Sequence, residues 1–135
     1  MRIAVVSAPA VKRAPPDYAE GLAKGMSMMG HRVDIVDAWT EDGFKLPGYE
    51  YIAVVAEPLS FISGKIHTNI AKILAAGSSL IGKKGAAFIK KSGLFSNRAL
   101  FNLMKAMEKE GMRVNWSDFI LNAPHAEALG KYIGA

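Results

Sequence analysis

The sequence contains no cysteine in its 135 residues. Disulfide bonds, thiolate metal sites and cysteine nucleophiles are therefore excluded, and the absence agrees with a reducing compartment. No apolar run approaches the roughly 20 residues needed to cross a bilayer, so we expect no membrane span. The apolar run at the N-terminus is interrupted by Pro9, which favours a first buried strand over a secretory signal peptide. These absences predict a cytoplasmic protein.

Histidine is scarce, and its three copies, His31, His67 and His125, stand far apart in the chain. None has a partner at metal-ligand spacing, so we predict no metal site. The sequence also lacks the Gly-x-Ser-x-Gly motif, the P-loop motif and the Gly-x-Gly-x-x-Gly motif. No side chain is therefore identified as catalytic, and whether the protein is an enzyme stays open.

Positive charge exceeds negative charge, with 17 Lys and Arg against 12 Asp and Glu, a net charge of +5 and a pI of about 9.5. This balance favours anionic partners, such as a phosphate ligand or an acidic protein. The chain has no run of five like charges, which argues against a nucleic-acid-binding tail. Half of the residues are hydrophobic, which predicts one folded domain over residues 1–135.

Short apolar runs alternate with segments of helical period along the chain. The apolar runs predict strands over 2–6, 31–37, 51–56 and 85–90 and within 112–120. The helical segments cover 17–29, 66–77, 100–111 and 124–133, whereas 39–50 is too polar and too rich in Gly and Pro for a long helix. Buried strands joined by helices predict a doubly wound parallel α/β sheet. Ligands bind such sheets at the carboxyl ends of the strands, which here lead into the loops 7–16, 57–64 and 91–97.

Several stretches of the sequence resemble the flavodoxin-like family, and together they cover nearly the whole chain. They are AEGLAKGMSMMGHRVDIVDA, LPGYEYIAVVAEPLSF, GKKGAAFIKKSG, LMKAMEKEGMRV and AEALGKYI. The resemblance implies a three-layer αβα sandwich with a five-stranded parallel sheet of order 2-1-3-4-5. It also implies FMN at the ends of the first, third and fourth strands, with a role in electron transfer or as a small flavin reductase.

The loop after the first strand departs from the family's phosphate motif, Ser/Thr-x-Thr-Gly-x-Thr. Only Ser7 matches the motif, at its first position, and Pro15 and Pro16 have no N–H to donate. Lys12 and Arg13 are the candidates to bind the phosphate instead, because a guanidinium binds phosphate through two hydrogen bonds. The alternative is that the phosphate site is lost and the pair is a solvated loop tip. We expect replacement of both by Ala to leave melting of the ligand-free protein nearly unchanged.

The other two loops keep more of the family's pattern. Pro58 follows the third strand as it does in the family, and Phe61 and Phe95 are candidates to flank the flavin ring. The alternative for both rings is that they cap the sheet edge or contact a partner. The cofactor-binding residues that the resemblance implies are Ser7, Lys12, Arg13, Pro58, Leu59, Phe61, Ser63, Gly64, Ser92, Gly93 and Phe95.

Two features favour a different class of function. The phosphate motif is degenerate, and the pI is basic, whereas electron carriers of this family are usually acidic. The alternative is a flavin-free binding or regulatory module that docks an acidic protein or binds another phosphorylated ligand. A redox protein partner and a homodimer both stay open. A receiver domain shares the strand order but needs acidic residues after strand one and Asp after strand three, where this chain has Ser7 and Glu57.

Overall fold

The protein is described by a computed structural model, which covers residues 1–60, 62–77 and 79–133. Strands and helices alternate along the chain, as the hydrophobic pattern predicts. The elements are β1 (Arg2–Ala8), α1 (Asp17–Met28), β2 (Arg32–Asp37), the 3-10 helix η1 (Gly43–Gly48), β3 (Tyr51–Ala56), α2 (Asn69–Ala76), β4 (Lys84–Lys90), α3 (Ser96–Lys109), β5 (Arg113–Ile120) and α4 (Ala123–Gly130).

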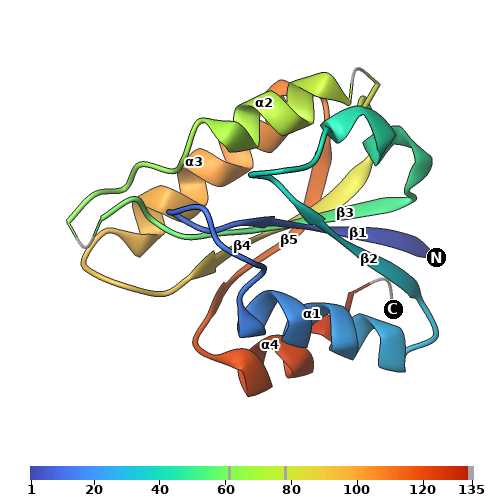
Figure 1. Cartoon of the computed structure of the whole chain (residues 1–135), viewed down its shortest axis with the longest axis horizontal. Helices are drawn as coiled ribbons and strands as arrows, with labels where there is room; N and C mark the ends of the chain where they lie inside the picture. The colour runs from blue at the N-terminus through green and yellow to red at the C-terminus, as the bar shows by residue number, and fades with distance from the viewer. Residues whose placement is uncertain (61, 78, 134–135) are drawn as a thin grey trace.

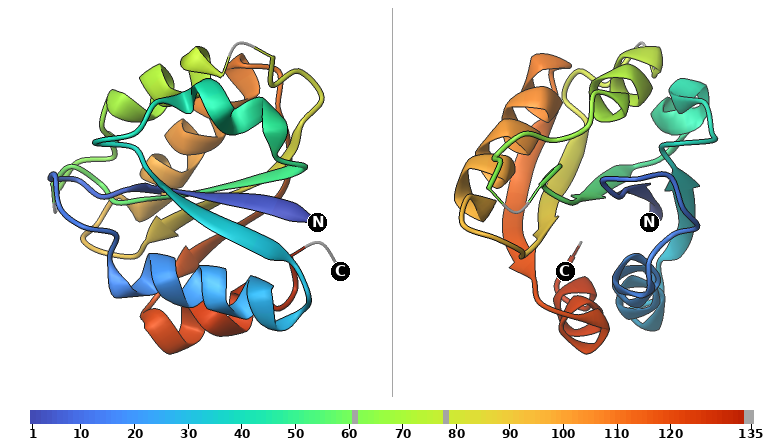
Figure 2. Two further views of the ribbon diagram at one scale, coloured as in Figure 1. Left: turned by 45° about the vertical axis from the view of Figure 1, so that its right-hand side comes forward. Right: turned by 60° about the vertical axis from the view of Figure 1, so that its left-hand side comes forward.

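The five strands form one sheet in the order β2-β1-β3-β4-β5, and all neighbouring pairs are parallel. Helices α1 and α4 cover one face of the sheet, while α2, α3 and η1 cover the other (Figures 1 and 2). The predicted three-layer α/β sandwich and its strand order are therefore confirmed. In the described part of the chain, no helix is long and apolar enough to cross a membrane.

The central strands are buried on both faces, which explains why they read as continuous apolar runs. In β3, Ile52 and Val54 pack toward α2 and α3, whereas Ala53 and Val55 pack toward α1 and α4. The edge strand β2 is instead partly buried or exposed at every position except Val36. A side chain at the carboxyl end of β1 or β3 points to one face of the sheet or to the other, according to its position in the alternation along its strand.

Several details differ from those that the sequence predicts, among them the start of α3 at Ser96 instead of 100 and the end of α4 at Gly130 instead of 133. Strand β1 continues to Ala8, because Ser7 and Ala8 pair with Val55 and Ala56 of β3, so Ser7 lies in the strand and not in the loop after it. Helix α2 begins at Asn69, and Ile66 packs against the core from the preceding loop. The connection over 39–50 has no long helix, as expected, but it contains η1.

Helices α1 and α4 pack with their backbones in close contact. A Cβ atom placed on Gly25 would lie 2.1 Å from the carbonyl oxygen of Glu127, and one on Gly130 would lie 2.4 Å from the carbonyl oxygen of Leu22. Only glycine permits this approach, because any side chain would overlap the backbone of the other helix. The close packing of α1 on α4 fixes the position of α1, including that of its first turn.

Candidate functional site

The loops after β1, β3 and β4 lie together at one end of the molecule. Parallel pairing aligns Ala8 with Ala56 and Ala56 with Ile89, so the three strands end side by side. The loops meet at the left-hand end of Figure 1, away from the chain termini. The structure thus brings together the three segments in which the sequence predicts binding residues.

The carboxylate of Glu57 is the centre of the hydrogen bonds at this end. One carboxylate oxygen accepts from the backbone N–H of Ala10 at 3.0 Å and from Nη1 of Arg13 at 3.1 Å. The other accepts from Nη2 of Arg13 at 2.5 Å and from the hydroxyl of Tyr18. Each oxygen accepts two hydrogen bonds, so the acceptor capacity of the carboxylate is filled. Glu57 therefore ties the end of β3 to the β1–α1 loop and to the first turn of α1.

Burial and hydrogen bonding act in opposite directions on the ionisation of Glu57. Its side chain is 16% exposed, and burial alone works to raise the pKa of the carboxyl. The hydrogen bonds from Arg13, Tyr18 and Ala10 outweigh that cost and bring the pKa below its ordinary value. Burial and the hydrogen bond to Glu57 raise the pKa of Tyr18 well above its usual range. The phenol therefore stays protonated and donates a hydrogen bond to Glu57.

Trp39, which follows β2, holds the same loop from the other side. Its indole N–H donates to the carbonyl oxygen of Pro9 at 2.9 Å. Its ring lies against the ring of His67, with 4.3 Å between the two centroids. Residues 9–13 are thus fixed by contacts with the ends of both strands that flank β1 in the sheet.

The hydroxyl of Ser7 is buried and unsatisfied. Ser7 is 1% exposed, and its Oγ has no hydrogen-bond partner among the described residues. Alternation along β1 puts Ser7 on the same face as Ile3 and Val5, which pack with Tyr18 in the cluster under α1. A buried hydroxyl without a partner costs about 1–3 kcal/mol. Ser7 is therefore a buried polar group at the β1–α1 junction whose hydrogen-bonding capacity is unused among the described residues.

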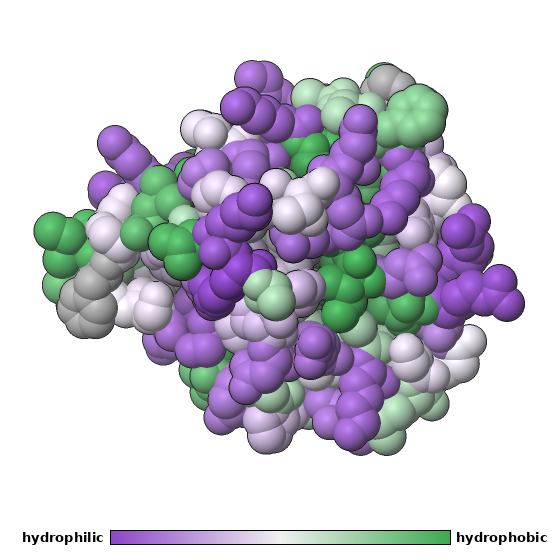
Figure 3. All heavy atoms as spheres, in the orientation of Figure 1, coloured by the Kyte–Doolittle hydropathy of each residue, from purple (hydrophilic) through white to green (hydrophobic). Residues whose placement is uncertain are grey.

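The loops after β3 and β4 expose a group of apolar side chains that we call the apolar rim. It consists of Leu59, Ile62, Leu94 and Phe95, all exposed. Hydrophobic side chains gather at the left-hand end of the molecule in Figure 3, where these loops lie. Monomeric proteins expose contiguous apolar surface sparingly, so the rim indicates a binding surface.

The rim is supported by the start of α3. The guanidinium of Arg98 lies 5.5 Å from the centroid of the Phe95 ring. Arg98 also covers Gly64, where a Cβ atom would lie 2.4 Å from the Arg98 side chain. The carbonyl oxygen of Gly64 accepts from Nδ2 of Asn102 at 2.8 Å. The loop after β3 is thereby held against α3.

The remaining predicted binding residues differ in their surroundings, and two of them have hydrogen-bond partners nearby in the chain. The hydroxyl of Ser63 accepts from the N–H of Lys65, and the N–H of Ser92 donates to the hydroxyl of Ser96. Gly93 has a φ of +72°, which glycine adopts without strain. Pro58 is buried, Lys12 and Leu59 are exposed, and Phe61 lies outside the described residues.

Glu57 and Tyr18 belong to this site although the sequence did not single them out as binding residues. In the sequence, Glu57 relates only to the receiver-domain alternative, and Tyr18 lies within the helical segment 17–29. A carboxylate directly after a buried strand is a usable signal, because it stands at the ligand end of the sheet. The partner of that carboxylate is not visible in the sequence.

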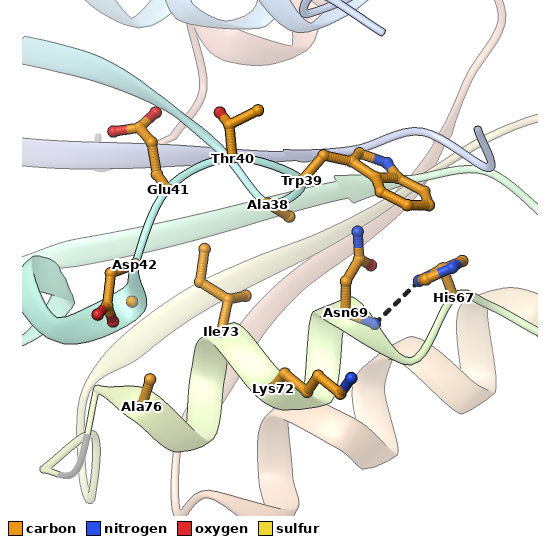
Figure 4. Close-up of a pocket in the computed structure, with 11 residues that line it drawn as sticks. Ala38, Trp39, Thr40, Glu41, Asp42, His67, Asn69, Lys72, Ile73 and Ala76 are labelled. Atoms are coloured by element: carbon orange, nitrogen blue, oxygen red, sulfur yellow. Dashed lines mark hydrogen bonds between the residues drawn. The ribbon is translucent and has the colours of Figure 1, made fainter. Parts of the chain in front are cut away.

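A separate cavity of about 550 Å³ lies between the segment 38–43 and α2 (Figure 4). Trp39 and His67 line its side nearest the β1–α1 loop, and Lys72 lies on the α2 side. The side-chain amide of Asn69 is buried there without a hydrogen-bond partner among the described residues. The backbone N–H of Asn69 donates to Nδ1 of His67 at 3.0 Å.

Similar solved structures share the fold at low sequence identity. A flavodoxin from the domain Archaea is 19% identical, with a TM-score of 0.70, over 97% of this chain and 94% of its own. Oxidised flavodoxin 2 from Bacillus cereus is 12% identical, with a TM-score of 0.72, over 96% of this chain and 95% of its own. The flavodiiron protein from Giardia intestinalis is 18% identical, with a TM-score of 0.69, over 96% of this chain and 35% of its own.

No protein-family model and no curated protein sequence matches the chain. These three solved structures are each less than 25% identical to it, so their likeness concerns the fold and not the ligand. The strand order β2-β1-β3-β4-β5, the two helical layers and these similar structures agree. The chain has the flavodoxin-like fold.

Proposed function

We propose that this protein binds FMN at the carboxyl end of its sheet and acts in electron transfer or as a small flavin reductase. Residues 1–135 act as one domain in this proposal, and the partners are FMN and a redox protein. The observation that carries it is the convergence of Ala10, Arg13 and Tyr18 on the carboxylate of Glu57. These donors bind an anion at the strand end where the resemblance implies the FMN phosphate.

The donor set fits a phosphate in its chemistry. A backbone N–H, a guanidinium and a hydroxyl are the groups that proteins use to bind phosphate oxygens. The unsatisfied hydroxyl of Ser7 supplies a further donor, at the first position of the family's motif. Lys12 is exposed beside Arg13 and adds positive charge. The Glu57 carboxylate, itself an anion, stands in for the phosphate in this arrangement.

The apolar rim fits the flavin ring. Leu59, Leu94 and Phe95 present exposed apolar surface beside the anion donors, and Ser92 and Gly93 form the turn between β4 and the rim. When bound, FMN supplies the one- and two-electron chemistry. The rim residues orient the ring and exclude water, and apolar surroundings disfavour a charged reduced form. The absence of cysteine agrees with the cytoplasm as the compartment.

A flavin titration tests the proposal. FMN and riboflavin are added in parallel to the purified protein, and quenching of flavin fluorescence is measured. We expect FMN to bind with a micromolar or lower Kd and riboflavin to bind at least about tenfold more weakly, because only FMN carries the phosphate. Absence of binding by both flavins would contradict the proposal.

A second candidate is the flavin-free module that docks an acidic protein. It is favoured because the loops after β1, β3 and β4 carry the basic residues Lys12, Arg13, Lys65 and Lys91 and only one acidic residue, Glu57. Basic groups around an apolar patch attract an acidic protein surface. This candidate predicts salt-sensitive binding of a polyglutamate peptide that Lys65→Glu with Lys91→Glu weakens. Flavin binding that polyglutamate does not compete with would argue against it.

A further inference from the structure

The donors that face the Glu57 carboxylate are all in use. Both Nη atoms of Arg13, the N–H of Ala10 and the hydroxyl of Tyr18 donate to Glu57. No second anion can take the same hydrogen bonds while the Glu57 carboxylate holds them. A phosphate placed beside that carboxylate would also be repelled by it, because two negative charges at contact distance repel strongly in a partly buried site.

The ion pair lies where a ligand can reach it. The Arg13 side chain is 40% exposed and that of Glu57 is 16% exposed. Glu57 follows the last residue of β3, so its side chain can rotate toward solvent without any change in the strand pairing that ends at Ala56. A carboxylate returned to water regains its hydration, which offsets part of the lost ion pair.

We propose that Glu57 is an internal competitor that closes the anion site, so that a phosphate group binds only by displacing the Glu57 carboxylate from Arg13. A phosphate dianion is the ligand suited to this exchange, because it carries more charge than a carboxylate and also binds a guanidinium through two hydrogen bonds. Glu57 thereby makes the site selective for phosphate over carboxylate ligands. The identity of the phosphate as that of FMN rests on the proposed function, whereas the displacement does not.

Displacement also releases the β1–α1 loop. Ala10 and Arg13 are the contacts of this loop with Glu57, and Pro9 is its contact with Trp39. Once the Glu57 carboxylate has moved away, a bound ligand replaces its hydrogen bonds with residues 10–13. Without a bound ligand, these hydrogen bonds are lost. Cleavage by trypsin after Lys12 or Arg13 therefore reports whether an anion is in place.

The first experiment compares flavin and phosphate binding by three proteins. Glu57→Gln keeps the size of the side chain and removes its charge, and Glu50→Gln is the matched control at the opposite end of the sheet, where Glu50 accepts from the N–H of Arg2. We expect FMN and inorganic phosphate to bind at least tenfold more tightly to Glu57→Gln than to the wild type. Glu57→Asp, whose shorter carboxylate reaches Arg13 less well, is expected to lie between them. Glu50→Gln is expected to bind as the wild type does.

The second experiment follows tryptic cleavage without any flavin. We expect Glu57→Gln to be cut after Lys12 or Arg13 at least tenfold faster than the wild type and Glu50→Gln, and inorganic phosphate to restore protection. Circular dichroism verifies that each variant is folded, and Glu57→Asp serves if Glu57→Gln is not. Equal cleavage rates and equal phosphate affinities in the wild type and the variants would overturn the proposal.

The two experiments separate this inference from the proposed function. If phosphate protects Glu57→Gln while no variant binds FMN, displacement stands and the ligand is a different phosphate compound. If FMN binds the wild type and Glu57→Gln equally and cleavage does not change, FMN binding stands and Glu57 is not a competitor.

Discussion

Glu57 and Arg13 are 44 positions apart in the chain and form an ion pair with two hydrogen bonds across the ends of β1 and β3. The pair gives the β1–α1 loop a fixed conformation although the loop lacks the glycine and threonines of a phosphate-binding loop. It also gives Arg13 a structural role that a solvated loop tip would not have.

Arg13→Ala is expected to lower the free energy of unfolding by about 1–2 kcal/mol, because Glu57 stays partly buried and loses the one cationic partner that it has among the described residues. Lys12→Ala is the matched control and is expected to change stability by less than about 0.5 kcal/mol, since Lys12 is exposed. Urea unfolding of the ligand-free proteins measures both. This expectation replaces the sequence-based one that the Lys12 and Arg13 double substitution leaves melting nearly unchanged. Equal urea midpoints for Arg13→Ala and the wild type would instead support the sequence-based expectation.

The pH dependence of stability is expected to show the contribution of Glu57. Its pKa in the folded protein lies below the ordinary value of 4.5, so the unfolded chain binds the proton more readily. The stabilisation is therefore complete above about pH 4.5 and is lost as the pH falls through the folded pKa. Urea unfolding from pH 3 to 7 is expected to show a smaller loss of stability at the acid end for Glu57→Gln. Parallel pH profiles for the two proteins would contradict this assignment.

Phe95→Ala is expected to weaken FMN and riboflavin equally, by about tenfold, because the two flavins share the ring that the apolar rim would contact. Phe101→Ala is the matched control. Phe101 is 60% exposed on α3 and pairs with Lys105, as Phe95 pairs with Arg98. Arg13→Ala is expected to weaken FMN and leave riboflavin unchanged. Fluorescence titrations of both flavins test this pattern, and a loss for FMN alone in Phe95→Ala would place the ring elsewhere.

Gly25→Ala is expected to destabilise the protein by about 2 kcal/mol, because the added methyl group would overlap the carbonyl of Glu127 and force α4 away from α1. Ser27→Ala, at an exposed position of the same helix, is the control and is expected to be nearly neutral. Thermal unfolding of the two variants compares them. A stable Gly25→Ala variant would mean that the helices can separate without loss of packing.

Local pattern was sufficient for the alternation of strands and helices and for a parallel α/β sheet, whereas the strand order was implied by the family resemblance. Central strands buried on both faces are apolar at every position, and helices carry an apolar stripe, so residues near in sequence report each element. The predicted boundaries differ from the observed ones where tertiary contacts extend or shorten an element. Pairing with β3 extends β1 through Ser7, and α2 begins only at Asn69.

The site was predictable in its location and not in its contacts. Ser7, Arg13 and Phe95 were expected at the carboxyl end of the sheet, because parallel strands end at one edge, and they lie there. Contact between Glu57 and Arg13 depends on how the β1–α1 loop folds over the end of β3, and no period in the sequence encodes that. Composition and hydrophobic period thus account for the layers and the strands. The occupant of the anion donors follows from three-dimensional proximity, because a guanidinium bonds whichever carboxylate the packed strands bring within reach.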